Sequence, residues 1–158
     1  MGKTIERSTF TIREIKQQEL AQLLELYRFL HPDDPVIEID RSIQQLWESI
    51  LNNPSLLYLG AYIADELVST CALTIIPNLT RGARPYAVIE NVVTHPQFRR
   101  RGMATQVLQH ALLIAWAQGC YKVMLLTGTK QESTLRFYKK AGFRRGDKTG
   151  FVARPPSG

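Results

Sequence analysis

The chain has little cysteine and no long apolar run. Its two cysteines, Cys71 and Cys120, lie in apolar segments and lack the spacing of metal ligands, so we expect buried thiols, a reducing cytoplasm and no metal site. No apolar run approaches the ~18–20 residues that cross a bilayer. The first residues lack the apolar core of a secretion signal. Together these absences predict a cytoplasmic protein that does not bind membranes.

Acidic residues are also fewer than basic residues. The chain has 20 Lys and Arg against 14 Asp and Glu, a formal net charge of +6 and an isoelectric point of about 9.5. The basic residues gather at 99–101, 139–140 and 144–148, without one long stripe and without aromatic residues between them. A basic stripe with interleaved aromatics is typical of nucleic-acid binding. We therefore expect a compact anionic ligand and no nucleic-acid partner.

The apolar pattern predicts a single mixed α/β domain over residues 8–154, followed by a frayed tail at 155–158. Helices are expected where apolar residues recur at helical spacing, over 20–27, 43–51, 102–117 and 131–141. Strands are expected over 10–15, 56–64, 67–76, 86–93, 121–126, 143–145 and 149–153.

Local signals place several boundaries. Ser42 and Gln45 have the spacing of a capping box at the start of the second helix. Asp65-Glu66 is expected to form the tight turn between the two long strands. The strand–helix–strand segment 86–126 should form a parallel crossover. A polar loop is expected between residues 77 and 85.

The most informative stretch is 97–105, with the sequence Gln-Phe-Arg-Arg-Arg-Gly-Met-Ala-Thr, which follows the apolar run 88–93 and opens a helix. Backbone amides at a helix N-terminus have no partner within the helix, and the helix dipole favours negative charge there. A basic, glycine-containing turn between a strand and a helix therefore forms an anion site. The three consecutive arginines at 99–101 indicate a ligand with several phosphates.

Two motifs resemble a known family. Arg99-x-x-Gly102-x-Ala104 is similar to the coenzyme-binding motif of the GCN5-related N-acetyltransferase (GNAT) superfamily. The segment 137–143, Phe-Tyr-Lys-Lys-Ala-Gly-Phe, resembles the late Tyr-x-x-x-Gly-Phe segment of that superfamily. The resemblance covers residues 8–154. It implies an acetyl-CoA-dependent acyltransferase with a strongly twisted mixed sheet of six to seven strands, flanked by about four helices.

The resemblance also implies how the coenzyme is held. The motif loop wraps the pyrophosphate in this family, which here means Arg99, Arg100, Arg101, Gly102, Met103, Ala104 and Thr105. The pantetheine arm would pair with a splayed strand at Val92, Val93 and Thr94, and the amide of Val92 or Val93 would polarise the thioester carbonyl. The family often has Asn after its fifth strand. This chain lacks that Asn, so we assign its contact to Gln131 and Thr134, with Ser133 as an alternative.

Tyr138 and Glu90 are the predicted catalytic residues. By resemblance Tyr138 donates a proton to the departing thiolate, because a phenol with a pKa of ~10 stays protonated at neutral pH. A tyrosine that only packs is the alternative. Glu90 lies in an otherwise apolar strand, where burial would make its carboxylate a better general base. A structural carboxylate, or one that binds a cationic group of the substrate, is equally open for Glu90.

Three functions fit these residues. The leading one is transfer of acetyl from acetyl-CoA to the primary amine of a small molecule, by direct attack in a ternary complex, because neither cysteine is placed as an acyl carrier. An acetyltransferase for protein N-termini or lysines and a non-catalytic acyl-CoA sensor are the alternatives. Asp33 or Asp34 would hold a cationic acceptor, although a solvated turn is the interpretation we favour. Dimers are common in the superfamily, which leaves a homodimer open.

Overall fold

The structure is a computed structural model that describes residues 9–156. Three predictions concern residues outside this range. They are residue 8 as the start of the domain, residues 157–158 as part of the tail, and the first residues as lacking a secretion signal. In chain order the elements are β1 (Thr11–Glu14), η1 (Gln17–Glu19), α1 (Leu20–Tyr27), α2 (Arg41–Leu51), β2 (Leu56–Ile63), β3 (Glu66–Ile76), α3 (Thr80–Ala83), β4 (Tyr86–Thr94), η2 (Pro96–Phe98), α4 (Met103–Ala117), β5 (Val123–Met124) and α5 (Glu132–Lys140). Within residues 9–156, no helix is both long and apolar enough to cross a bilayer.

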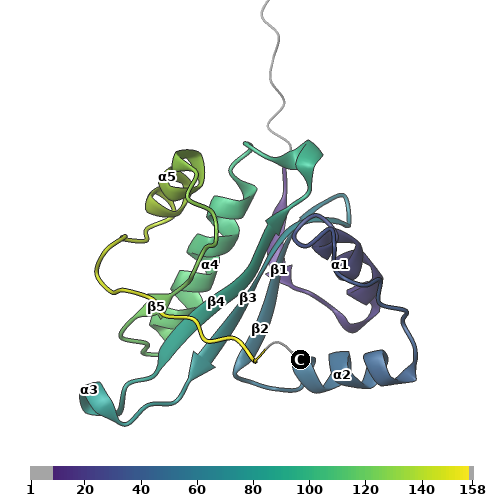
Figure 1. The fold of residues 1–158 in the computed structure, drawn as a ribbon. Coiled ribbons are helices and arrows are strands. Elements are labelled where there is room, and N and C mark those ends of the chain that lie inside the picture. The colour runs from purple at the N-terminus through teal and green to yellow at the C-terminus, as the bar shows by residue number, and fades with distance from the viewer. Residues whose placement is uncertain (1–8, 157–158) are drawn as a thin grey trace, which may run out of the picture.

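A mixed sheet with the strand order β1-β2-β3-β4-β5 runs through the molecule. The strands from β1 to β4 pair antiparallel, and β5 pairs parallel to β4. Helices α1 and α2 lie on one face of this sheet, while α4 and α5 lie on the other (Figure 1). The mixed α/β fold and the parallel crossover through α4 are therefore confirmed.

Each face of the sheet has its own apolar core. Successive side chains of a strand point to opposite faces, so the neighbours Ala61 and Tyr62 of β2 belong to different cores. The core under α4 and α5 includes the fully buried side chains Leu59, Leu73, Ile89, Val107 and Leu108. The core under α1 and α2 includes Leu23, Leu26, Trp47, Tyr62 and Leu67. Burial of such aliphatic and aromatic side chains stabilises each layer by about 1.5–3 kcal/mol per side chain.

The sheet has fewer strands than the six to seven that the sequence predicts, and the difference lies near the C-terminal end. The described residues form five strands, and neither 143–145 nor 149–153 is one of them. β5 is two residues long rather than covering 121–126, so it offers almost no edge for another strand. Between the two predicted strands, Gly146 has a φ of 92° and breaks the extended backbone.

Two local predictions are wrong by a few residues. The N-cap of α2 is Asp40, whose carboxylate accepts hydrogen bonds from the Ile43 amide at 2.9 Å and the Ser42 hydroxyl at 2.7 Å. Ser42 therefore lies inside the helix and is not a capping box residue. The turn between β2 and β3 is formed by Ala64 and Asp65, with φ of 46° and 68°, as in a type I′ hairpin turn. The predicted loop 77–85 contains the four-residue segment α3, in which Arg81 and Gly82 have left-handed backbone angles.

Candidate active site

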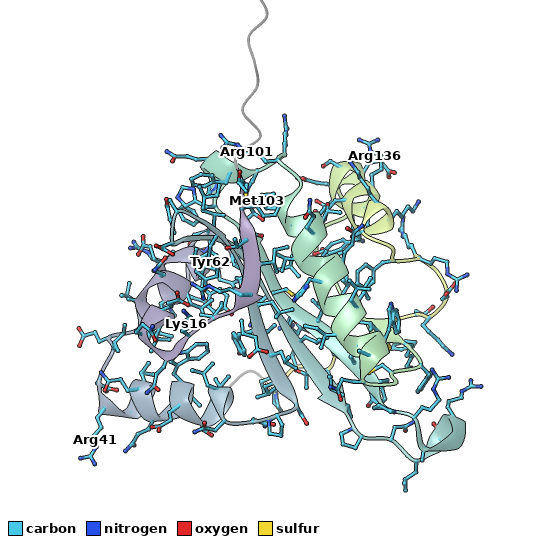
Figure 2. The ribbon with its side chains drawn as sticks, turned by 180° about the vertical axis from the view of Figure 1, so that it is seen from behind. Lys16, Arg41, Tyr62, Arg101, Met103 and Arg136 are labelled. Atoms are coloured by element: carbon cyan, nitrogen blue, oxygen red, sulfur yellow. The ribbon has the colours of Figure 1, made fainter. Side chains whose placement is uncertain are left out.

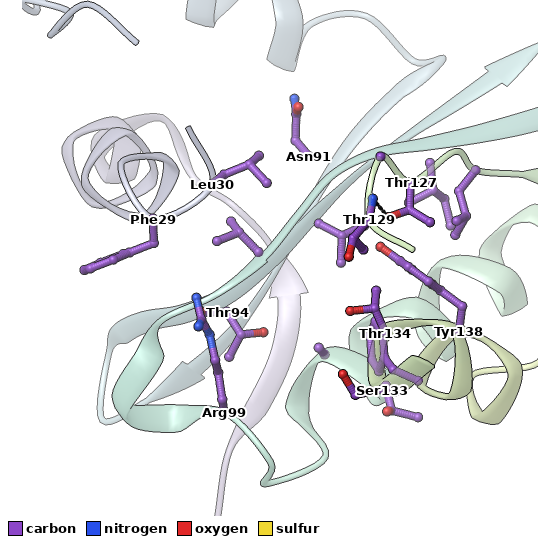
Figure 3. A pocket seen from close by; sticks show the side chains of 18 of the residues that line it. Phe29, Leu30, Asn91, Thr94, Arg99, Thr127, Thr129, Ser133, Thr134 and Tyr138 are labelled. Atoms are coloured by element: carbon purple, nitrogen blue, oxygen red, sulfur yellow. Dashed lines mark hydrogen bonds between the residues drawn. The ribbon is translucent and has the colours of Figure 1, made fainter. Parts of the chain in front are cut away.

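A cavity of about 1260 Å³ opens beside the C-terminal half of β4. Figure 3 shows Phe29 and Leu30, which follow α1, on one side of β4, and Ser133, Thr134 and Tyr138 of α5 on the other. Of the residues predicted to bind the coenzyme or to act in catalysis, all except Arg101 line this cavity, namely Glu90, Val92, Val93, Thr94, Arg99, Arg100, Gly102, Met103, Ala104, Thr105, Gln131, Thr134 and Tyr138. Their individual roles stay predictions, but the fold brings them to one place.

The start of α4 leaves room and free donors for an anion. Gly102, the N-cap, has a φ of 81°, and Arg100 has a φ of 63°. In this left-handed conformation a residue with a Cβ atom is destabilised by ~1–2 kcal/mol relative to glycine, which favours glycine at position 102. No side chain of the described residues caps the helix. Apart from Gly102 itself and the residues on either side of it, no heavy atom lies within 4 Å of the place where a Cβ of Gly102 would sit. The amides of the first turn therefore have no capping side chain, and the residues Met103, Ala104 and Thr105 that carry them line the cavity.

The three arginines of this turn have different positions. Nε of Arg99 donates a hydrogen bond to the carbonyl of Thr94 at 3.2 Å, which ties the turn to the end of β4. Arg100 is exposed at the cavity. The guanidinium of Arg101 lies 5.3 Å from the ring centroid of Phe98 and does not line the cavity. Figure 2 shows Arg101 at the same end of the molecule as Met103, whose side chain is 1% exposed and anchors the helix in the core.

A β-bulge interrupts β4 next to the cavity. Thr70 of β3 pairs with Val93 and Ala72 pairs with Glu90, so the single residue between them on β3 faces both Asn91 and Val92. Asn91 takes up the extra length with a φ of 54°, a conformation in which Asn is more common than other residues with a Cβ. The bulge shifts the alternation of β4, so that Val92 packs with the α4 core and Val93 with the α1 core.

Beyond the bulge, β4 has an open edge. Its pairing with β5 ends after Ala87–Val123 and Val88–Met124. The Val93 carbonyl faces β3, because it accepts a hydrogen bond from the Ser69 hydroxyl at 3.3 Å. Backbone groups of successive strand residues point to opposite edges. The amide of Val92 therefore points away from β3, toward the gap between β4 and β5.

Tyr138 reaches the cavity from the last helix. Gly142 ends α5 with a φ of 109°, and the next amide, that of Phe143, donates to the Tyr138 carbonyl at 3.0 Å. The Tyr138 ring packs against Phe137 and Phe143, with centroids 4.8 Å and 6.3 Å away. Burial raises the pKa of the Tyr138 phenol above its ordinary 10.0, and the ionisable groups of Cys71 and Glu90 raise it further. The phenol is therefore protonated at neutral pH, and Figure 3 shows it directed toward β4.

Glu90 lines the cavity, but it is not buried as the sequence suggests. Its side chain is exposed, although Ile89 beside it is 1% exposed. The reason is the alternation of the strand, which directs Ile89 to the core under α4 and Glu90 to the other face. The argument from burial for a general base is therefore wrong. A base or a substrate ligand at this position acts from a solvated carboxylate.

The comparison with known proteins decides the family. Residues 19–143 match the model of the Acetyltransferase (GNAT) family. The chain belongs to this family. A putative acetyltransferase from Agrobacterium tumefaciens str. C58 has a solved structure that is 41% identical in sequence, covers 92% of this GNAT chain and 99% of its own, and superposes with a TM-score of 0.87.

Two further similar proteins carry more specific names. The glucosamine 6-phosphate N-acetyltransferase of Trypanosoma brucei brucei is 38% identical over 79 residues, which are 50% of this chain and 52% of that protein. The match thus spans about half the length of that relative. AAC(6')-Iy in complex with the bisubstrate analogue CoA-S-monomethyl-acetylneamine superposes with a TM-score of 0.75 at 21% identity, over 94% of this chain and 99% of its own. At that identity the likeness shows the fold alone.

Of the other residues considered in the sequence, Ser133 lines the cavity, whereas Asp33, Asp34 and both cysteines do not. Burial raises the pKa of Cys71 to about 12, so this thiol is protonated at neutral pH. Among residues 9–156, no three His, Cys, Asp or Glu side chains are grouped in a way that would hold a metal ion.

Sequence reasoning missed several residues of the cavity wall. Phe29, Leu30 and Arg154 are distant in sequence from the predicted residues, whereas Asn91, Phe98 and Lys140 lie close to them in the chain. Asn91 is the one with a local signal, because an asparagine inside an apolar strand is typical of a bulge or turn. Phe29 and Arg154 lie in segments without regular structure, where no periodicity indicates which way a side chain points.

Proposed function

We propose that this GNAT protein transfers the acetyl group of acetyl-CoA to the primary amine of a small molecule. The observation that carries the proposal is a single cavity with three features of acyl transfer. It joins the uncapped start of α4, the open edge of β4 at Val92 and the protonated phenol of Tyr138. The start of α4 suits phosphates, the edge of β4 suits a peptide-like arm, and the phenol suits a leaving thiolate, and these three groups follow one another along one ligand.

The residues of the cavity fit coenzyme A. The amides from Arg99 to Thr105 would hold the pyrophosphate, where Gly102 lets phosphate oxygens approach the backbone. The open edge from Val92 to Thr94 would pair with the amides of the pantetheine arm. Acetyl-CoA supplies a thioester, whose carbonyl carbon accepts the amine and whose thiolate leaves.

The chain's own groups have defined tasks in such a transfer. The substrate ammonium first loses a proton to water or to Glu90, and the free amine lone pair then forms a bond to the carbonyl carbon. The Val92 amide donates a hydrogen bond to the oxygen that becomes negative. The carbon–sulfur bond breaks, and the Tyr138 hydroxyl gives its proton to the thiolate. The amide product loses the second amine proton, and Tyr138 regains its own from solvent.

A small acceptor agrees best with the cavity. Its lining contains the basic residues Arg99, Arg100, Lys140 and Arg154 and one acidic residue, Glu90. A basic lysine-rich peptide would need more acidic partners than this. The relative named for glucosamine 6-phosphate supports an amino sugar phosphate as the first acceptor to test. A sensor without turnover would require neither the raised pKa of Tyr138 nor its direction toward β4.

The test is turnover of acetyl-CoA, followed by thiol release, across a panel of amines. The panel contains glucosamine 6-phosphate, glucosamine, a polyamine, an aminoalkyl acid and a short peptide with a free N-terminus and a lysine. We expect turnover on one small-molecule class. Turnover on the peptide alone would make a protein amine the acceptor in place of a small molecule. Tight coenzyme binding without turnover on any amine would favour a non-catalytic acyl-CoA sensor.

Replacement of Gly102 by alanine should weaken coenzyme binding. A Cβ at a φ of 81° is strained by ~1–2 kcal/mol, and relief of that strain would turn the amides that face the pyrophosphate. We expect the dissociation constant for CoA, measured by calorimetry, to rise about tenfold. Gly119→Ala is the matched control, because Gly119 has a φ of 79° and equally open surroundings at the far end of α4. An equal effect of both variants on CoA binding would contradict the assignment.

Replacement of Glu90 by glutamine separates its two possible roles. As a base, Glu90 would speed the loss of the ammonium proton, so Glu90→Gln should lower kcat about tenfold near neutral pH. The loss should shrink at a pH where the free amine already predominates. Glu66→Gln, at another exposed position, is the control. A raised KM for the amine with unchanged kcat at every pH would instead make Glu90 a substrate ligand.

A further inference from the structure

His95 holds the backbone between β4 and residues 99–105, which we call the coenzyme loop. Its backbone amide donates to the Val68 carbonyl at 2.8 Å, which fixes the residue to the sheet. Its Nδ1 accepts a hydrogen bond from the Gln97 amide at 3.3 Å and so caps η2, whose first residue is Pro96. The imidazole does not line the cavity. It therefore acts on the cavity only through its neighbours.

Those neighbours come from two different segments of the chain that line the cavity. The imidazole centroid lies 4.7 Å from the ring of Phe29 and 5.5 Å from the ring of Phe98, with edge-to-face angles of 73° and 63°. Phe29 follows α1, and Phe98 is the last residue of η2, just before the arginine turn. Both phenylalanines line the cavity. Three rings thus connect the end of α1 with the loop that precedes α4, and the guanidinium of Arg101 continues the series over Phe98.

We propose that His95 is a positioning residue that couples the coenzyme loop to the part of the cavity wall that Phe29 and Leu30 form at the end of α1. The inference rests on the proposed function, because the loop is taken as the CoA site. Edge-to-face contacts depend on ring orientation, so a loop that is ordered by CoA orders His95 and, through it, Phe29. Residues 32–40 after this wall contain no helix or strand, so the wall lacks a rigid support of its own on that side.

The coupling predicts a response at backbone amides of the wall. The amides of Phe29, Leu30 and His31 donate to the carbonyls of Leu26 and Tyr27, with lengths of 3.1, 2.9 and 3.0 Å. These hydrogen bonds open when the end of α1 frays, which hydrogen exchange detects. Saturation with CoA should slow exchange at residues 29–31 of the full chain about fivefold or more, the size of a coupling near 1 kcal/mol. Exchange of the Asn52 amide, at the end of α2, should not change.

Three variants separate the two parts of the role, which are the cap on η2 and the ring contacts with Phe29 and Phe98. His95→Ala loses the ring and the acceptor atom, His95→Asn keeps a side chain that caps helices, and His95→Phe keeps an aromatic ring. We expect His95→Ala to bind CoA about fivefold more weakly and, at saturating CoA, to show no protection of residues 29–31. His95→Asn should recover CoA affinity without the protection. His95→Phe should recover the protection once CoA is saturating.

The outcomes are distinct from those that test the activity. Unchanged CoA affinity and unchanged protection in His95→Ala would overturn the coupling, and so would loss of both in all three variants together with a lower melting temperature. If His95→Ala does not fold, Phe29→Leu at the surface replaces it, and full protection of residues 29–31 in that variant would overturn the proposal. Wild-type protein that binds CoA without acetylating any amine would contradict the proposed function and leave this test in force.

Discussion

Replacing Tyr138 by phenylalanine should lower kcat for acetyl transfer by about 100-fold, while the KM for acetyl-CoA stays within about twofold. The phenylalanine ring keeps the contacts with Phe137 and Phe143 at 4.8 and 6.3 Å, so α5 should stay in place. What is lost is the hydroxyl that protonates the leaving thiolate. Because that proton is needed only as the carbon–sulfur bond breaks, the loss affects kcat and not ground-state binding.

The measurement is the steady-state rate of thiol release with saturating amine, for wild type, Tyr138→Phe and the control Tyr121→Phe. Tyr121 packs edge-to-face on Tyr86 at 6.4 Å and does not line the cavity, so its variant should keep wild-type kcat. Burial raises the pKa of Tyr138 above 10.0, and wild-type kcat should therefore not fall from its ionisation below about pH 10. A wild-type kcat in Tyr138→Phe would show that water protonates the thiolate.

The parts of the site that sequence could predict are those built from neighbours in the chain. The turn before α4 is one, because Gly102 supplies the left-handed backbone and the helix that follows shows its own periodicity. Tyr138 is another, since Gly142 four residues later ends the same helix and returns the Phe143 amide to it. The order of strands from 56 to 94 follows from their apolar alternation and short connections in the same way.

The parts that sequence could not predict depend on pairing between distant residues. The exposure of Glu90 depends on which face of β4 each helix covers, and the helices covering those faces are α1 and α4. The segment 149–153 has the composition of a strand, but the two-residue β5 gives it no partner. Phe29, which lines the cavity, packs on His95, a residue much later in the sequence. No local pattern contains these relations.

Replacing Glu19 by glutamine should lower the free energy of unfolding by about 2 kcal/mol at pH 7. Glu19 is 8% exposed, and its carboxylate accepts hydrogen bonds from Arg13 at 2.6 and 2.9 Å, from the Lys16 amide at 2.7 Å and from the Tyr62 hydroxyl at 2.8 Å. Figure 2 shows Tyr62 and Lys16 near each other beside α1. Breaking a buried ion pair costs ~3–5 kcal/mol. The Arg13 side chain is 30% exposed, so solvent screens the pair and reduces that cost.

The dependence on pH gives this prediction a second readout. The hydrogen bond from Arg13 lowers the pKa of Glu19 from 4.5 to about 2. A carboxyl whose pKa is lower in the folded state stabilises the fold fully above its unfolded value, and this stabilisation is lost as the pH falls from about 4.5 through 2. Urea unfolding should therefore show wild type and Glu19→Gln converging over that interval, while they differ by a constant amount above about pH 5.5.

The control is Glu25→Gln, which removes an ion pair with Arg28 at 3.3 Å between side chains that are 65% and 64% exposed. Water screens such a pair, so its loss should cost less than about 0.5 kcal/mol. Equal losses in the two variants, or a Glu19→Gln protein that keeps the wild-type slope of stability between pH 4.5 and 2, would contradict the role of Glu19. Because Glu19 joins β1 and β2 to the start of α1, a loss confined to Glu19→Gln would make this carboxylate the anchor that holds the start of α1 to the sheet.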